Sequence, residues 1–256
     1  ITSCDSSPLQ TVPDSMKIAL ALLAVACQQG YRTIWYAFMT VLNEPSSCSR
    51  REARKRDRQE MILEVAQRYF LDHGYAGTTM SGIAAALGGS KGTLWSHFPS
   101  KDALFAAVLD RVARAYRARL SQILDPDAGL EEVLLGACIS LVGKVTSPEA
   151  IALQRLVISE GGRFPELSRI FFELAPRNTR ALLAEFLEGA MRRGALRAAD
   201  PLEAARALTA LCMAGLHHQL LMGQISHVEP ENIERDAAFA VDLFLRGYAP
   251  APGSSM

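Results

Sequence analysis

The sequence predicts an all-α fold, in which an N-terminal three-helix helix-turn-helix unit precedes a larger helical domain. From about residue 57 onward, apolar residues recur at spacings of three and four, which is the helical period. Glycine and proline interrupt this pattern at intervals typical of helix lengths. No segment shows the alternation of β-branched residues, bounded by turns, that indicates a strand.

Composition narrows the class of protein. The 256 residues are 49% hydrophobic, which is ample for a core, and Lys+Arg (27) equals Asp+Glu (27). A globally basic coat is therefore excluded, so any surface for nucleic acid must be local. The five cysteines include no C-x-x-C pair, so we expect no metal site, no cofactor and no disulfide framework, as in a cytoplasmic protein. Cys138 and Cys212 lie in apolar stretches and are predicted core residues.

Residues 1–49 differ from the rest and are interpreted as a flexible or non-native extension, with translation starting at Met16 or Met39. The unbroken apolar run, Ile18–Cys27, is too short to span a bilayer. Lys17, this run and the letters AVAC weakly resemble a lipoprotein signal, which leaves a membrane tether as an alternative. We otherwise expect no stable association with a membrane.

A basic arm follows. RREARKRDR (50–58) holds six Lys/Arg against two acids, a local excess of +4. Such a run is usually a solvated surface. Its position ahead of the first helix instead favours contacts with phosphates, with Arg54 and Arg56 as the candidates.

Three short helices are predicted next. An apolar stripe from Ile62 to Phe70 forms the first, and Gly74 ends it. Thr79 caps a second helix that contains Ile83 and Ala84. Gly88-Gly89 forms a turn, and Ser90 caps a third helix that is ended by Pro99-Ser100.

A long helix from Lys101 to Leu124 then leads into five helical runs. These lie near 129–146, 149–161, 165–193, 201–222 and 230–247, with Pro176 kinking or dividing the third. The expected domains are therefore the extension (1–49), the arm and helix-turn-helix (50–100), the linking helix with the larger domain (101–249), and a flexible tail (250–256).

The stretch GGSKG (88–92) has two interpretations. It matches the G-x-S-x-G nucleophile elbow of a hydrolase, in which Ser90 would attack substrate. That elbow requires a preceding strand, whereas MSGIAAAL is Ala-rich and helically spaced. The context favours helix-turn-helix, so we do not expect an enzyme. A helical carrier or enzyme with a merely structural head remains the alternative.

Residues 58–109 resemble the TetR family of transcriptional regulators. The resemblance is carried by Phe-x-x-x-Gly-Tyr, Thr-Thr, Ile-Ala, Ser-Lys-Gly-x-Leu, His-Phe and Ser-Lys-x-x-Leu, in that order. RLVISEGGRFPELSRIFFE (155–173) is similar to a subgroup that often controls multidrug-efflux genes. The resemblance implies a homodimer that binds a pseudo-palindromic, double-stranded DNA operator and is released by a small lipophilic effector, most often as a repressor.

The resemblance also implies roles for individual residues. The residues expected to contact DNA, besides the arm, are Thr79, Ser90, Lys91, Gly92, Thr93, Trp95, Ser96, His97 and Lys101. Trp95 could instead be a boundary aromatic that closes the small domain. Gly89, Trp95 and Ser96 depart from the family pattern, and we expect them to shape the operator preference.

The larger domain is expected to bind the effector and to form the dimer. Candidate pocket residues, for which core packing is the alternative, are Leu134, Cys138, Leu141, Leu156, Phe171, Phe172 and Phe186. Candidate interface residues on the last two runs, for which burial within the monomer is the alternative, are Leu208, Leu211, Gly215, His218, Phe239 and Leu243. The adjacent His217 and His218 point about 100° apart on a helix and are interpreted as interface or surface residues.

Overall fold

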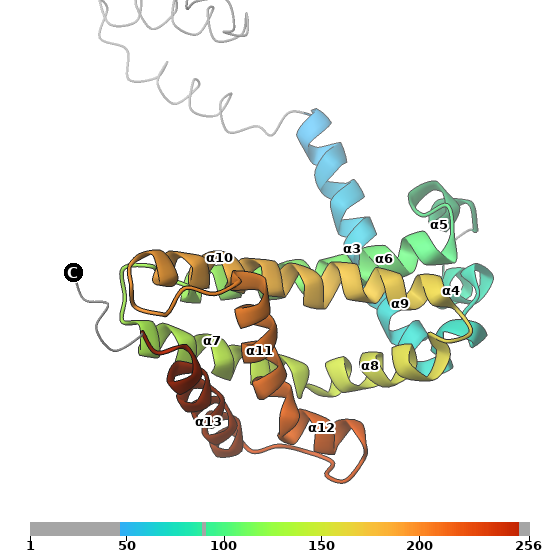
Figure 1. The fold of residues 1–256 in the computed structure, drawn as a ribbon. Coiled ribbons are helices and arrows are strands. Elements are labelled where there is room, and N and C mark those ends of the chain that lie inside the picture. The colour runs from blue at the N-terminus through green and yellow to red at the C-terminus, as the bar shows by residue number, and fades with distance from the viewer. Residues whose placement is uncertain (1–46, 89–90, 251–256) are drawn as a thin grey trace, which may run out of the picture. The chain divides into compact units, whose positions relative to one another are not determined.

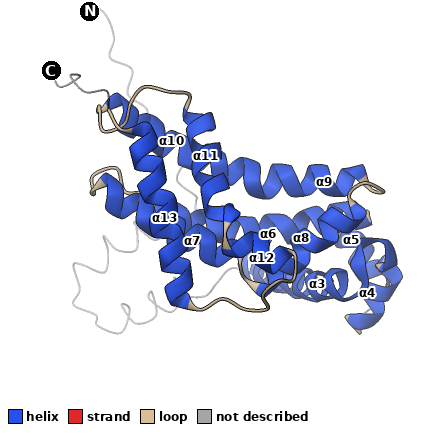
Figure 2. Ribbon diagram, turned by 60° about the horizontal axis from the view of Figure 1, so that its bottom comes forward, coloured by secondary structure: helices blue, strands red, loops and turns tan. Residues whose placement is uncertain are grey.

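The computed structural model describes residues 47–88 and 91–250, and every regular element in these ranges is a helix (Figures 1 and 2). The elements are α3 (Ser47–Gly77), α4 (Met80–Ala86), α5 (Lys91–His97), α6 (Lys101–Ile123), α7 (Leu130–Val145), α8 (Pro148–Glu160), α9 (Pro165–Phe172), the π-helical turn η1 (Glu173–Arg177), α10 (Asn178–Arg192), α11 (Pro201–Ala214), α12 (Leu216–Leu221) and α13 (Pro230–Tyr248). Residues 1–46 of the predicted extension, Gly89, Ser90 and residues 251–256 of the predicted tail lie outside the described residues.

The chain divides into two compact units, residues 1–57 and 58–256. In the first unit, the described residues are the beginning of α3, which starts at Ser47 rather than near residue 57. The basic arm is therefore helical. Arg, Lys, Glu and Ala are all strong helix formers, which explains why this charged segment takes up helical backbone.

In the second unit, α3 from Arg58, α4 and α5 form a small three-helix assembly, which we call the head. Gly74 has a φ of 69° and interrupts α3, as its position after His73 predicts. The core of the head contains Ile62, Phe70, Ile83 and Leu94, all at most 1% exposed.

The core of the head continues into the larger domain. The same cluster of buried side chains includes Phe105 and Val108 on α6, Leu156 on α8, and Leu167 and Ile170 on α9. Packing therefore does not divide at residue 100, where the sequence predicts a domain boundary, but extends along the first half of α6.

A second buried cluster lies at the other end of α6. It joins the end of α6 to α7, α10, α11 and α13, and α13 packs along α7 while α10 packs along α11 (Figure 1). Cys138 and Cys212 are buried there with free thiols, as expected of small core residues.

Two breaks refine the predicted runs. Pro176 lies within the π-helical turn η1, which divides α9 from α10. Gly215 divides the run 201–222 into α11 and α12, a break that the sequence analysis missed. The Asp236 carboxylate accepts a hydrogen bond from the Leu216 N–H at 2.9 Å, and a Cβ at Gly215 would collide with that carboxylate.

Among the described residues, no single helix combines the length and hydropathy needed to cross a bilayer. Taken together, α7 and α8 satisfy both criteria, but the two are bent by 64° at the break between them.

Candidate nucleic-acid interface and adjoining cavity

The turn between α3 and α4 is built by local contacts. Thr79 caps α4, where its Oγ1 accepts a hydrogen bond from the Gly82 N–H at 3.0 Å, as predicted. Thr78 has a different role, because its buried hydroxyl donates to the Gly74 carbonyl at 2.6 Å. Gly82 lies directly under Tyr69, and a Cβ there would collide with the Tyr69 ring. A side chain at position 82 would force the Tyr69 ring to move, so Gly82 allows this approach of α3 and α4.

α5 presents one apolar face inward and a polar face outward. Leu94 and Phe98 are buried in the head, whereas Trp95 is 49% exposed and Ser96 is exposed. This exposure argues against the alternative in which Trp95 closes the small domain. Gly92 is also exposed, and Thr93 and His97 are half-buried. Ser90 lies outside the described residues, as does the side chain of Lys91.

Lys101, predicted to contact phosphate, is engaged inside the protein. Its Nζ donates to the Tyr75 carbonyl at 2.8 Å and lies 4.2 Å from the centre of the Tyr75 ring. Asp102 accepts a hydrogen bond from the Tyr75 hydroxyl. The start of α6 thus fixes the turn that follows Gly74.

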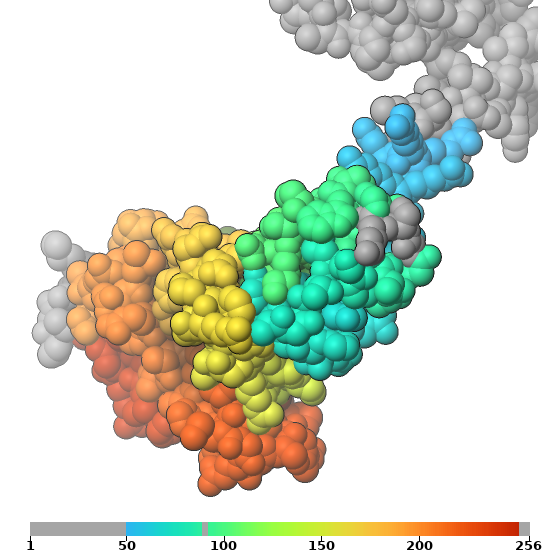
Figure 3. All heavy atoms as spheres, turned by 90° about the vertical axis from the view of Figure 1, so that its right-hand side faces the viewer, coloured from blue at the N-terminus to red at the C-terminus, as the bar shows by residue number. Residues whose placement is uncertain are grey.

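Glu160 holds the same turn from the other side and was missed in the sequence. Its carboxylate accepts hydrogen bonds from the Tyr75 N–H at 2.8 Å and the Ala76 N–H at 2.6 Å. Figure 3 shows the yellow residues around the end of α8 against the cyan residues of this turn. A signal was available, because an acid at a helix C-terminus opposes the macrodipole and implies another partner.

Most side chains of the basic arm are exposed. Arg54 and Arg56 are exposed on the first part of α3. Nothing in the described residues supplies the strand that the hydrolase interpretation of Ser90 requires, and the helix α4 precedes this position. No group of His, Cys, Asp and Glu side chains in the described part of the chain is arranged to hold a metal ion.

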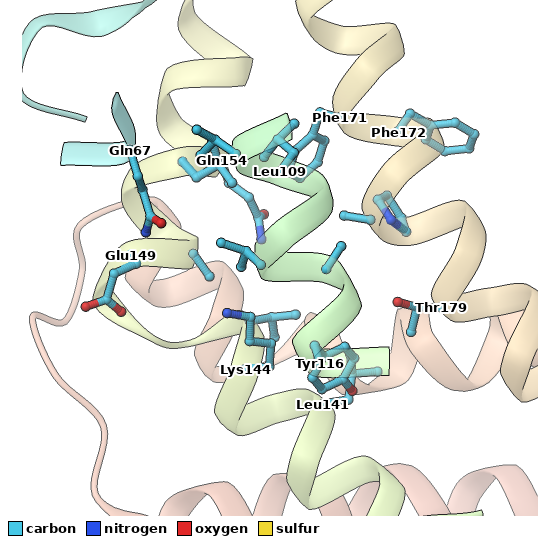
Figure 4. Close-up of a pocket in the computed structure, with 18 of the residues that line it drawn as sticks. Gln67, Leu109, Tyr116, Leu141, Lys144, Glu149, Gln154, Phe171, Phe172 and Thr179 are labelled. Atoms are coloured by element: carbon cyan, nitrogen blue, oxygen red, sulfur yellow. The ribbon is translucent and has the colours of Figure 1, made fainter. Parts of the chain in front are cut away.

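A cavity of about 440 Å³ opens beside the head, within the range of small-molecule sites (Figure 4). Three of the candidate pocket residues, Leu141, Phe171 and Phe172, line it. Leu134, Cys138, Leu156 and Phe186 do not, and are instead packed in the two buried clusters. Periodicity shows that these four are inward-facing, but it does not show whether they face a neighbouring helix or a void.

The cavity and the head share a wall. Phe70, Phe105, Val108 and Leu109 belong to the core of the head and also line the cavity. α8 makes a second link, because it lines the cavity with Glu149 and Gln154 and ends in Glu160 at the turn of the head.

Three further polar side chains at the cavity wall, Lys144, Tyr116 and Arg180, lie on α7, α6 and α10. Lys144 on α7 is half-buried, and burial lowers its pKa, with a smaller opposing effect from Glu149. The Tyr116 hydroxyl and Arg180 Nε are buried without a hydrogen-bond partner. Burial raises the pKa of Tyr116, and an interaction with Ser140 opposes this, so the phenol stays neutral.

The prediction that His217 is an interface or surface residue is wrong. It is 4% exposed rather than a surface or interface residue, and its Nε2 pairs with Gln154 Oε1 at 2.8 Å. Burial lowers the pKa of His217 below its usual 6.5. The break at Gly215 turns α12 back toward α8, which is why this side chain points inward. His218 is exposed, as expected.

The predicted interface residues differ in their exposure to solvent. Phe239 and Leu243 are 63% and 40% exposed on α13. Leu208 is 1% exposed within the core of this chain, and Leu211 packs partly against that core. Gly215 lies against Asp236. Among the predicted interface residues, the exposed apolar side chains are therefore Phe239 and Leu243 on α13, whereas Leu208 is buried.

Comparison with known proteins agrees with this arrangement. Residues 62–108 match the model described as bacterial regulatory proteins, tetR family. Residues 132–250 match the AefR-like transcriptional repressor C-terminal domain. The chain is 24% identical over 184 residues to the HTH-type transcriptional regulator UidR of Escherichia coli strain K12, covering 71% of this chain and 87% of UidR.

Two solved structures share the fold. The flavonoid-responsive regulator FrrA is 32% identical, with 75% of this chain and 98% of FrrA covered at a TM-score of 0.66. SmeT, the repressor of the Stenotrophomonas maltophilia multidrug efflux pump SmeDEF, is 26% identical, with 77% of this chain and 93% of SmeT covered at a TM-score of 0.56.

The molecule is thus a helix-turn-helix DNA-binding transcriptional regulator with a helical C-terminal domain. It belongs to the TetR family.

Proposed function

We propose that the protein is a repressor that leaves its operator when a small lipophilic effector enters the cavity. The observation that carries this proposal is the wall that the cavity shares with the core of the head, through Phe70, Phe105, Val108 and Leu109. An effector in contact with these side chains has a direct physical route to the helices that would read DNA.

On DNA, α5 would enter the major groove with its N-terminal end near the base edges. Ser90, Lys91, Gly92 and Thr93 would lie at the groove, and Trp95 would pack on sugar-phosphate or a thymine methyl. Further phosphate contacts would come from Thr79, Ser96, His97, Arg54 and Arg56. Lys101 would reach a phosphate only through the N–H donors that the Tyr75 carbonyl does not use. The Thr79 hydroxyl is suited to this role because it can accept from the Gly82 N–H while donating to a phosphate.

Release would follow from a shift between two conformations. α6 runs from the head to the second buried cluster, so a tilt of α6 on ligand entry would move the head. Lys101 and Glu160 tie the turn of the head to α6 and α8, so it would follow both helices. The effector then favours the form that fits the operator poorly.

The effector is expected to be lipophilic and aromatic. The cavity is lined by Phe171 and Phe172, and FrrA, which covers three quarters of this chain, is a flavonoid-responsive regulator. SmeT represses an efflux pump, which fits the predicted efflux subgroup.

A homodimer would bring two heads onto a pseudo-palindromic operator. The exposed Phe239 and Leu243 on α13, with the exposed Leu202 on α11, offer the apolar surface for it. Sedimentation of the wild type and of a double variant that carries both Phe239→Glu and Leu243→Glu tests this interface. A dimer that becomes monomeric in the double variant is expected, and a wild-type monomer at micromolar concentration contradicts it.

Fluorescence anisotropy with DNA from upstream of the protein's own coding sequence tests the function. Affinity should fall by at least about tenfold between about 50 and 200 mM salt, because phosphate contacts release counterions. Lys91→Ala should weaken binding at both salt concentrations, and Arg192→Ala, which removes an exposed cation on α10, should not. Binding that is insensitive to salt or to Lys91→Ala would favour the helical carrier instead.

A further inference from the structure

We propose that the cavity selects an aromatic ligand that carries one negative charge, a carboxylate or an acidic phenol, with Lys144 as its counter-ion. This inference rests on the proposed function of the cavity as the effector site and adds the charge of the effector.

The walls fit a flat apolar body. Phe171 and Phe172 lie together at one end of the cavity, and Lys144, Glu149 and Gln67 lie toward the other (Figure 4). Aromatic side chains contribute most by stacking or edge contacts with another ring, so this end favours an aromatic ligand. A ring held here would direct a substituent toward the polar end.

Lys144 is a charge without a direct partner. Its ammonium makes no hydrogen bond and no ion pair within 4 Å to any other described residue, although its side chain is half-buried. Glu149 attracts it, but Glu149 is exposed, so water screens that attraction. A partly buried ammonium is stabilised by an anion that brings its own hydrogen-bond acceptors.

The other free groups at the wall donate hydrogen bonds as well. The guanidinium of Arg180 has a buried Nε–H without an acceptor, and the buried Tyr116 hydroxyl has no partner of normal geometry. By contrast, the amide oxygens of Gln67 and Gln154 are already occupied, by Arg111 at 2.7 Å and His217 at 2.8 Å. Apart from the exposed Glu149 carboxylate, the charged and unpaired polar groups at the wall are therefore donors, which is complementary to a carboxylate or phenolate.

A cationic ligand fits less well. Glu149 is the one acidic side chain at the wall, and it is exposed, whereas a cation inside would meet both Lys144 and Arg180. Repulsion and lost hydration would both oppose its entry.

Isothermal titration of the full chain, without DNA, with a matched pair of probes tests the proposal. The probes are 2-naphthoate and 2-naphthamide, which share a ring system and differ in charge. Naphthoate should bind about tenfold or more tightly than naphthamide, because hydrogen bonds to a charged group contribute more. Lys144→Gln should abolish most of this preference while leaving the affinity for naphthamide unchanged.

Three variants complete the design. Lys144→Arg should retain the preference, Arg180→Gln should reduce it, and Arg192→Gln, an exposed cation of the same helix as Arg180, should leave it intact. Circular dichroism shows whether each variant is folded, and the Arg180→Gln comparison stands even if Lys144→Gln is not.

The proposal is overturned if neither probe binds, if both bind equally, or if the preference for naphthoate is as large in folded Lys144→Gln or folded Arg180→Gln as in the wild type. These outcomes leave the proposed function separate, because operator binding and its salt dependence are measured without either probe. Conversely, selective binding of naphthoate with no operator binding would support this inference and contradict the repressor.

Discussion

The head and the cavity are neighbouring regions that the chain builds in opposite ways. The helix ends of the head are set by residues close in sequence, with Thr79 capping α4 and Gly74 turning the chain. The cavity is lined by side chains from α3 through α11, far apart in sequence. The head can therefore be read as a motif, whereas the cavity depends on how long helices pack. Their shared wall makes the two interdependent.

The largest loss of stability should come from substitutions in the wall that the cavity shares with the head. Phe105 is fully buried, and its ring lies 5.1 Å from Phe70 and 5.4 Å from Tyr75. Phe105→Ala should lower the free energy of unfolding by about 4 kcal/mol, through lost burial and a residual cavity. Phe172→Ala, at a cavity residue that is 50% exposed, should cost less than about 1 kcal/mol but weaken naphthoate binding. Urea unfolding measures both, and equal costs would show that the wall is not structurally special.

Glu160 should give the next largest effect. Glu160→Ala removes the acceptor of two N–H groups in the turn of the head, and should cost about 2 kcal/mol. Glu188→Ala, which breaks an exposed pair with Arg192, is the matched control and should cost less than about 0.5 kcal/mol. If operator affinity and stability are unchanged in Glu160→Ala, this contact does not hold the head.

Thr79 allows its two roles to be separated. Thr79→Ala should destabilise the protein by about 1 kcal/mol, since it removes the cap of α4, and should also weaken operator binding. Thr79→Ser keeps the hydroxyl and should restore both. Thermal unfolding and anisotropy give the two readouts, and a loss of stability with full operator affinity would assign Thr79 a purely structural role.

The smallest effect concerns pH. The pKa of His217 lies below 6.5 in the folded protein, so protonation favours the unfolded chain. The contribution of this residue to stability is therefore complete above about pH 6.5 and declines as the pH falls below it. His217→Gln should flatten the fall in unfolding free energy between about pH 7.5 and 5.5. An identical pH dependence in both proteins would contradict the assignment.

The parts of the fold that could be predicted from the sequence are those that depend on residues adjacent in the chain. Gly74, Thr79 and the Pro99-Ser100 break mark helix ends through backbone conformation and capping, which act locally. The DNA contacts remain predictions.

Long-range packing explains what was missed. Gly215 resembled a small residue inside an apolar run, and only the approach of Asp236 from α13 accounts for the break there. Glu160 accepts hydrogen bonds from residues 84 and 85 positions away in the chain. His217 pairs with a residue 63 positions away. No local pattern specifies such partners, and the same reason explains why Leu134 and Leu141 could not be distinguished as core and cavity residues.

Operator affinity measured with and without saturating 2-naphthoate, at one salt concentration, tests most directly the claim that cavity and head are coupled. The account predicts that naphthoate weakens operator binding by at least about fivefold and, by linkage, that operator DNA weakens naphthoate binding by the same factor. Tight naphthoate binding that leaves operator affinity unchanged would contradict it.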